Sequence, residues 1–136
     1  MTTTAGEPID VRLGRICRTL ADVIERYGPT ELAIESIYFG ENTKSAIATA
    51  QARGAAIVAC STAGLKVGEY TPMQIKQAVV GTGAADKHQV AYMVRSVLAL
   101  DHEPRPDHAA DALAAAVCHA NVTRTKSLSE SRRVLT

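Results

Sequence analysis

Hydrophobic and polar positions follow two different periods along this chain, and the shorter period predicts two strands. Residues 30–39, TELAIESIYF, alternate enough to predict a strand that we expect to be central in a sheet. Residues 66–72, KVGEYTP, predict a second, short strand. Helical segments separate the two, which favours parallel pairing and an α/β layer. Because two parallel strands do not form a stable sheet alone, either further strands escaped recognition or the chain lacks a piece.

The longer period predicts helices around these strands. Apolar side chains recur at helical spacing over 9–27, and Gly28-Pro29 provides the stop. Thr71 is a predicted N-cap, with Pro72 at the first helical position behind it. The other predicted helices are an alanine-rich one over 41–64, opened by Asn42 or Thr43 and closed by Gly64, one within 82–100 and one over 107–120.

Length and composition predict one folded domain. The chain has 136 residues, 46% of them hydrophobic, which is enough for a core. Its apolar runs are too short for a membrane span, and the N-terminus lacks the basic-then-apolar order of a signal peptide. Cys17, Cys60 and Cys118 have no ligand spacing, so we interpret them as small apolar side chains in a reducing cytoplasm. We expect a disordered leader at 1–8, a main domain at 9–121 and a flexible tail at 122–136.

Charge is distributed unevenly between the main domain and the tail. The net charge of the chain is +1, but Arg124, Lys126, Arg132 and Arg133 face a single Glu130 in the tail. The rest of the chain is therefore slightly acidic and is no general nucleic-acid binder. Any affinity for nucleic acid has to come from locally placed lysines, helped by the tail.

Acidic residues stand at positions where apolar residues would serve packing better. Glu35 lies inside the first apolar strand, where a carboxylate is costly unless it is paired or binds metal. Asp111 lies one turn inside the alanine-rich last helix, and His108 precedes it by three residues on the same face. Each has an ordinary alternative: Glu35 could face solvent, Asp111 could stabilise the helix dipole and His108 could be a surface residue. Asp107, after Pro106, has the position of an N-cap.

Considered together, these residues favour a metal site. A strand carboxylate that faces a helix with His and Asp at i and i+3 offers oxygen and nitrogen ligands for Mg²⁺ or Mn²⁺. Two such ions that share carboxylates are a common means of hydrolysing a phosphodiester with water. The sequence therefore predicts metal-dependent phosphodiester hydrolysis.

Four segments in order closely resemble the bacterial RuvC family of Holliday-junction endonucleases: LAIESIYFGEN, TAQARGAAIVAC, YTPMQIKQAVVGTGAADKHQVAYMV and DHAADALAAAVCH. The resemblance runs from Val11 to Asn121. It implies an RNase H-like fold with three α/β/α layers. It also implies an endonuclease of DNA recombination and repair in which Glu35, His108 and Asp111 are catalytic metal ligands, with two ions per site. Asp107 would then stay a cap.

The resemblance also implies DNA contacts and partners. Tyr38 resembles the aromatic residue that the family inserts near the junction crossover, and Lys76 and Lys87 match lysines that contact the DNA backbone. Core packing for Tyr38 and plain surface positions for the lysines remain alternatives. Asn42 occupies a matched loop position and could simply cap a helix. A four-way DNA junction, a homodimer and the branch-migration helicase complex of RuvA and RuvB are the implied partners.

The helix over 42–64 resembles the helix through which the family dimerises. Its small residues would permit close approach of a second subunit, although core packing within one subunit is the alternative. These residues are Ala46, Ala48, Ala50, Ala52, Gly54 and Ala55.

One family feature has no counterpart in the sequence. Members begin with a strand that carries a Gly-x-Asp-Pro-Gly motif, and the early Asp10 lies at the approach to the first helix, where it cannot replace that aspartate. The expectation is that the first strands of the sheet are missing and that the chain as written is catalytically incompetent and marginally folded. Two hypotheses follow: a junction-resolving endonuclease with a truncated or misannotated start, or a non-catalytic remnant that binds DNA or dimerises.

Overall fold

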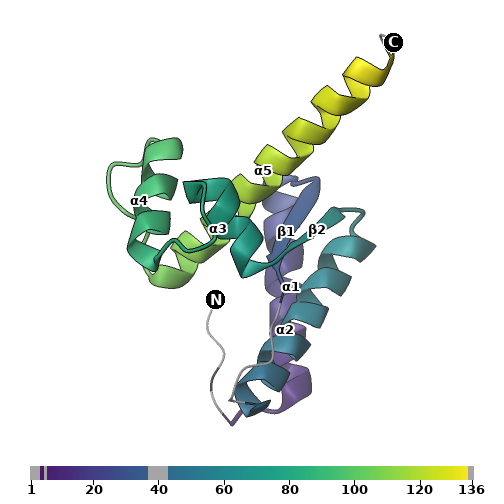
Figure 1. Ribbon diagram of the computed structural model, residues 1–136. Coiled ribbons are helices and arrows are strands. Elements are labelled where there is room, and N and C mark those ends of the chain that lie inside the picture. Colours follow the sequence, from purple (N-terminus) through teal and green to yellow (C-terminus); the bar gives the residue numbers. More distant parts are fainter. Residues whose placement is uncertain (1–3, 5, 37–42, 135–136) are drawn as a thin grey trace. The chain divides into compact units, whose positions relative to one another are not determined.

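The computed structural model describes residues 4, 6–36 and 43–134 (Figure 1). The elements are α1 (Ile9–Tyr27), β1 (Glu31–Glu35), α2 (Thr43–Thr62), β2 (Lys66–Tyr70), α3 (Pro72–Val80), α4 (Lys87–Val97) and α5 (Asp107–Val134). They divide into two compact units. The first unit contains α1 and α2 with the beginnings of both strands, and the second contains the ends of both strands with α3, α4 and α5.

In the first unit, α1 and α2 pack side by side (Figure 1). Ile16 of α1 is buried, and the Cys17 thiol donates to the Ala55 carbonyl of α2 over 3.6 Å. The helix α1 ends as predicted because Gly28 adopts a left-handed conformation with φ of 57° and its N–H donates to the Ile24 carbonyl. Such a backbone conformation is easy for glycine and strained for other residues.

Part of the predicted disordered leader is held to α1. The Glu7 carboxylate pairs with the Arg15 guanidinium through contacts of 2.7 and 3.0 Å. This pairing is the main reason that the pKa of Glu7 lies below its usual value. Residues 1–3 and 5 lie outside the described part of the chain.

The two strands form a parallel pair, as their separation by helices predicts. The Lys66 N–H donates to the Thr30 carbonyl at one end of the pair, and the Ser36 N–H donates to the Tyr70 carbonyl at the other end. No further strand joins them within the described residues. Strand β1 ends at Glu35, and residues 37–39 of the predicted strand are not among those described.

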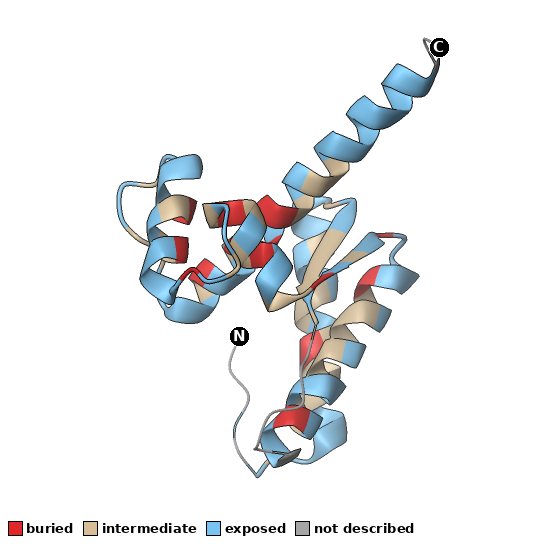
Figure 2. Cartoon of the chain, viewed as in Figure 1, coloured by how far each residue is buried: buried red, intermediate tan, exposed pale blue. Residues whose placement is uncertain are grey.

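The second unit has its core between α3, α4 and the first half of α5. Figure 2 shows buried positions gathered on these helices, whereas the last turns of α5 are exposed. Val94 and Cys118 are completely enclosed. Other members of this core are Tyr70, Ile75, Val79, Ala85, Val90, Ala114, Ala115 and Val117.

Two capping boxes fix where α3 and α4 begin. The Thr71 hydroxyl accepts from the Gln74 N–H over 3.0 Å, and the Gln74 side chain accepts in return from the Thr71 N–H over 2.8 Å. Asp86 and Gln89 make the same reciprocal pair at the start of α4. The cap at Thr71 confirms the prediction, and the cap at Asp86 starts α4 at Lys87, within the predicted range 82–100.

Two predictions about the last helix are wrong. The helix α5 does not stop near residue 120 but continues to Val134, and Asp107 is its first residue rather than a cap before it. Beyond residue 120 most side chains are polar, and Val122, Leu128 and Val134 are too widely spaced to continue the apolar period, although the helix does not break. The flexibility expected of residues 122–136 stays a prediction. Among the described helices, none has the length and hydropathy required of a membrane span.

Candidate active site

A cavity of about 340 Å³ in the second unit brings together side chains that are far apart in the sequence. We call it the carboxylate cavity. Its polar walls are Glu35, Lys76, Lys87 and Asp111, and its apolar walls are Pro72, Ile75, Val90 and Ala114. All eight residues belong to the same compact unit. The cavity therefore has two carboxylates and two ammonium groups above an apolar base.

Each polar side chain reaches the cavity from a different element. Glu35 is the last residue of β1, where the strand leaves the pair with β2. Asp111 lies just over one turn inside α5, Lys76 lies in α3 and Lys87 is the first residue of α4. The capping boxes at Thr71 and Asp86 fix the first turns of the two helices that carry the lysines. They therefore also fix the backbone positions from which the Lys76 and Lys87 side chains extend.

The neighbours of Glu35 in the carboxylate cavity shift the pKa of its carboxyl. Partial burial raises the pKa of its carboxyl above the usual value, and the negative charge of Asp111 raises it further. The positive charges of Lys76 and Lys87 oppose this rise. Because two carboxylates that share a site repel each other, the arrangement favours a bound cation or proton.

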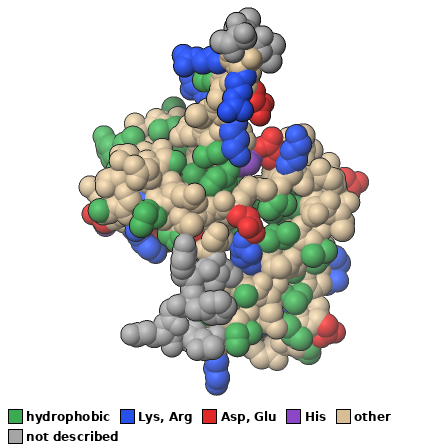
Figure 3. Space-filling model, turned by 45° about the vertical axis from the view of Figure 1, so that its right-hand side comes forward, with side chains coloured by type: hydrophobic (Ala, Val, Ile, Leu, Met, Phe, Trp, Pro, Cys, Tyr) green, Lys and Arg blue, Asp and Glu red, His purple; other side chains and the backbone are tan. Residues whose placement is uncertain are grey.

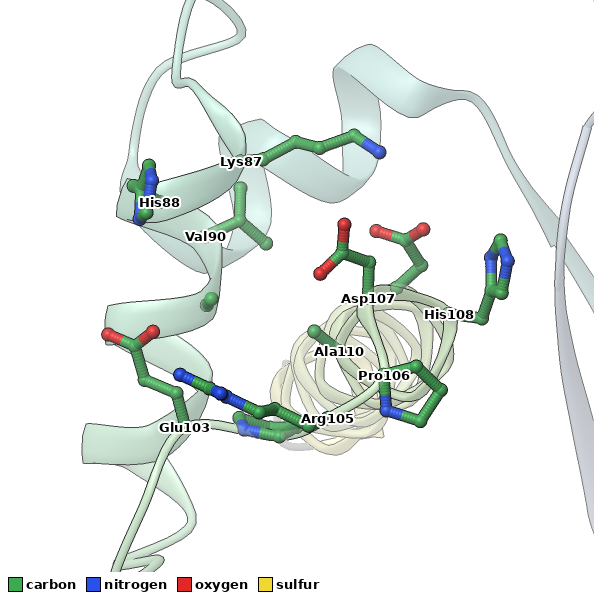
Figure 4. A pocket seen from close by; sticks show the side chains of 12 residues that line it. Lys87, His88, Val90, Glu103, Arg105, Pro106, Asp107, His108 and Ala110 are labelled. Atoms are coloured by element: carbon green, nitrogen blue, oxygen red, sulfur yellow. The ribbon is translucent and has the colours of Figure 1, made fainter.

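A wider cavity of about 770 Å³ opens at the N-terminal end of α5 (Figure 4). Lys87, Val90 and Asp111 line this cavity as well as the carboxylate cavity. Asp107 and His108 line the wider cavity, and Figure 4 shows the Lys87 side chain extending over the side of the helix on which Asp107 lies. His88, Glu103 and Arg105 complete its polar lining. Sequence reasoning missed these three residues, although two of them stand in the connector directly before the acidic helix start.

The predicted metal ligands are only partly brought together. Glu35 and Asp111 share the carboxylate cavity, but His108 lines the wider one. Within the described residues, no group of three His, Cys, Asp or Glu side chains is close enough to hold a metal ion. The two carboxylates fit a divalent cation by their chemistry, because hard cations prefer oxygen ligands and their mutual repulsion would be relieved. His108 as a third ligand stays a prediction.

Two predicted DNA-contacting residues fall outside the described chain. Tyr38 and Asn42 both lie within 37–42, so their predicted roles stay predictions. Lys76 is half-buried at the cavity wall, and Lys87 is exposed.

Comparison with known proteins places these observations in a family. The family model described as crossover junction endodeoxyribonuclease RuvC matches residues 1–119. Relatives of that name include one from Moorella thermoacetica, 49% identical over 119 residues that cover 88% of this chain and 71% of the relative. Another, from Desulforamulus reducens, is 45% identical over 118 residues that cover 87% of this chain and 72% of the relative.

Two solved structures agree with this assignment. The Thermus thermophilus RuvC structure is 42% identical and superimposes with a TM-score of 0.86, covering 93% of this chain and 76% of that one. The same protein in complex with a Holliday junction substrate gives a TM-score of 0.87 at 42% identity, covering 92% of this chain and 76% of that one. This similarity confirms the predicted α/β, RNase H-like fold class. The chain therefore belongs to the crossover junction endodeoxyribonuclease RuvC family.

Proposed function

We propose that the carboxylate cavity belongs to the active site of a metal-dependent endonuclease that resolves Holliday junctions by paired phosphodiester hydrolysis, a reaction that also needs the family's Gly-x-Asp-Pro-Gly aspartate. The observation that carries the proposal is the carboxylate cavity, in which Glu35 and Asp111 face Lys76 and Lys87. Carboxylates suit a divalent cation, and lysines suit the phosphates of a DNA backbone. The relatives are named for this activity, and one solved structure holds such a junction.

The two carboxylates would hold the metal of this activity. We assign Mg²⁺, with Mn²⁺ as an alternative and two ions per site, to Glu35, Asp111 and the nearby His108. When bound, the metal supplies an activated water and stabilises negative charge on the phosphate. Glu35 and Asp111 have to be ionised for this role, and the two lysines help to keep the Glu35 carboxyl ionised.

The lysines would also bind the substrate. Lys76 and Lys87 reach the cavity from two different helices, so together they can fix the position of one DNA strand beside the carboxylates. Tyr38 and Asn42 are proposed to contact the junction near its crossover. The basic end of α5 carries Arg124, Lys126, Arg132 and Arg133, and Figure 3 shows Lys and Arg side chains on the part of the chain that leads to the C-terminus. This segment is proposed to add affinity for DNA.

Paired cleavage calls for two active sites, and α2 is the proposed dimer face. Ile47, Gly54 and Val58 are exposed along one side of this helix, at spacings of seven and four residues. A Cβ added at Gly54 would meet nothing within 4 Å, so a second subunit could approach the backbone closely there. Ala46 is instead buried and the Ala55 carbonyl accepts from Cys17 of α1, which indicates that part of the small-residue pattern serves packing within the subunit. RuvA and RuvB are the proposed helicase partners, in the cytoplasm.

Replacement of Glu35 by Gln tests the proposal. In a full-length version that also carries the family's Gly-x-Asp-Pro-Gly motif, the variant should bind a synthetic four-way junction as its parent does but should lose Mg²⁺-dependent cleavage, because the shape survives and the ligand charge does not. Glu31→Gln, at the exposed other end of the same strand, is the matched control and should cleave normally. Cleavage by the Glu35→Gln variant would contradict the assignment. A parent chain that binds the junction without cutting it would instead favour the alternative of a non-catalytic DNA-binding protein.

A further inference from the structure

Tyr70 makes three connections within the second unit, and each leads to a different wall of the carboxylate cavity. Its backbone carbonyl accepts a hydrogen bond of 2.7 Å from the N–H of Ser36, the residue that follows Glu35. Its phenol oxygen lies 2.6 Å from Nδ1 of His119 in α5. Its peptide bond leads directly to Thr71, the cap of the helix that carries Lys76.

The phenol end of this connection is well enclosed. Tyr70 is only 8% exposed and belongs to the core of the second unit. Its ring meets the His119 ring edge-on, with centroids 5.6 Å apart and planes at 66°. A hydrogen bond forms with either tautomer of neutral imidazole, since the phenol donates when Nδ1 is bare and accepts when Nδ1 carries the proton.

The helix end of the connection leads back to the site. His119 lies about two helical turns after Asp111 in α5. Between them, Ala114, Ala115 and Cys118 are buried against the rest of the unit, so this stretch of helix is packed along its length. A displacement of α5 along its axis at His119 would therefore also displace Asp111.

Resting on the proposed function, we propose that Tyr70 is a positioning residue that sets the separation of Glu35 and Asp111. Its carbonyl holds the end of the strand that carries one carboxylate, and its phenol holds the helix that carries the other. Neither group of Tyr70 lines the cavity, so the residue acts through Ser36 and His119 and does not touch substrate. Separation of two metal-binding carboxylates matters because Mg²⁺ demands near-ideal geometry from its ligands.

The first test measures how firmly the end of β1 is held and does not depend on cleavage. Hydrogen exchange at the Ser36 amide is measured by NMR in the parent chain, in Tyr70→Phe and in His119→Leu. The Lys66 amide, which bonds Thr30 at the other end of the same strand pair, is the internal reference. Both variants remove the hydrogen bond between the Tyr70 phenol and His119. If this loss is transmitted to the strand end, exchange at Ser36 should accelerate about fivefold, the factor for one hydrogen bond, while exchange at Lys66 stays unchanged. His119→Asn, which keeps a polar group near the place of Nδ1, should restore much of the protection.

The second test measures single-turnover cleavage of a pre-bound four-way junction, with the same variants made in a full-length version that carries the family's Gly-x-Asp-Pro-Gly motif. Both variants should lower the cleavage rate about tenfold and raise the half-saturating Mg²⁺ concentration, with junction affinity unchanged. The double variant should lose no more than either single variant, since both remove one bond. Tyr92→Phe removes the hydroxyl of an exposed tyrosine in α4 and should change nothing.

The outcomes separate the two proposals. Equal acceleration of exchange at Ser36 and Lys66 would overturn the positioning role, and so would no acceleration at either amide. A cleavage rate that stays unchanged in a variant with faster Ser36 exchange would overturn it as well. A full-length parent that does not cleave junctions would contradict the proposed function, yet the exchange measurement would still decide whether Tyr70 connects strand and helix.

Discussion

Glu35 at the end of β1 and Asp111 in α5 face one cavity, and the charge of Asp111 contributes to the raised pKa of the Glu35 carboxyl. Partial burial is the larger cause of that rise. Two carboxylates from distant parts of the chain therefore share one electrostatic environment. Their repulsion is unfavourable for the protein alone and becomes favourable when a divalent cation lies between them.

The first prediction concerns this pair of carboxylates. Asp111→Asn removes a negative charge and should lower the pKa of Glu35, whereas Lys76→Ala removes a positive charge and should raise it further. Carbon-13 NMR titration of the Glu35 side-chain carboxyl measures both shifts. Shifts of the same sign in the two variants would contradict the shared environment.

The second prediction concerns how the stability of the fold depends on pH through Glu35. A carboxyl whose pKa is higher in the folded than in the unfolded chain binds protons more tightly when folded, so its contribution to stability falls as pH rises above about 4.5. Glu35→Gln should therefore raise the melting temperature at neutral pH and lose that advantage below pH of about 4.5. The effect should be small because Glu35 is exposed. An advantage that persists at acid pH would point to a packing effect instead.

The third prediction concerns DNA contact by the cavity lysines. Lys76→Ala and Lys87→Ala should each weaken junction binding and reduce the slope of log affinity against log salt by about one counterion. Fluorescence anisotropy with a labelled junction over a series of salt concentrations measures both quantities. Lys44→Ala, which changes an exposed lysine at the start of α2, is the control. An unchanged slope in the Lys76 and Lys87 variants would mean that these lysines are surface residues that do not contact DNA.

The fourth prediction tests the proposed dimer face. Val58 is 59% exposed on α2, and Val58→Glu should weaken self-association at least about tenfold, because a charge buried in an apolar interface is costly. Sedimentation equilibrium measures the association constant. Val97→Glu, at a similarly exposed valine of α4, should leave association unchanged, and an equal effect of both substitutions would argue against α2.

The fifth prediction concerns the cap that fixes α3 beside the cavity. Thr71→Ala should lower the free energy of unfolding by about 1 kcal/mol, since the Gln74 N–H loses its acceptor. Thr71→Ser keeps a hydroxyl acceptor and should retain most of the stability that the cap contributes. Urea denaturation measures the change. Thr125→Ala is the matched control because its hydroxyl bonds the Asn121 carbonyl within its own helix, at an exposed position.

Local features of this protein were determined by the sequence alone. The span of α1, the parallel strand pair and the cap at Thr71 were all predicted, because side-chain periodicity and hydrogen bonding to nearby backbone act over a few residues. Glu35, Asp111, Lys76 and Lys87 were also singled out in advance. Resemblance to a family, rather than spacing, supplied the roles of the two lysines.

Tertiary structure decided which of these residues share a cavity. It brought Glu35, Asp111 and both lysines together, but it placed His108 on the wider cavity although His108 and Asp111 are neighbours on one helix. It also revealed Tyr70 and His119 as partners, which no local pattern marks because the two residues meet only when strand and helix pack. The continuation of α5 to Val134 escaped prediction because an exposed helix needs no apolar stripe. Its hydrogen bonds join residues of the helix itself, as the hydroxyls of Thr125 and Ser131 do when they bond carbonyls of the preceding turn.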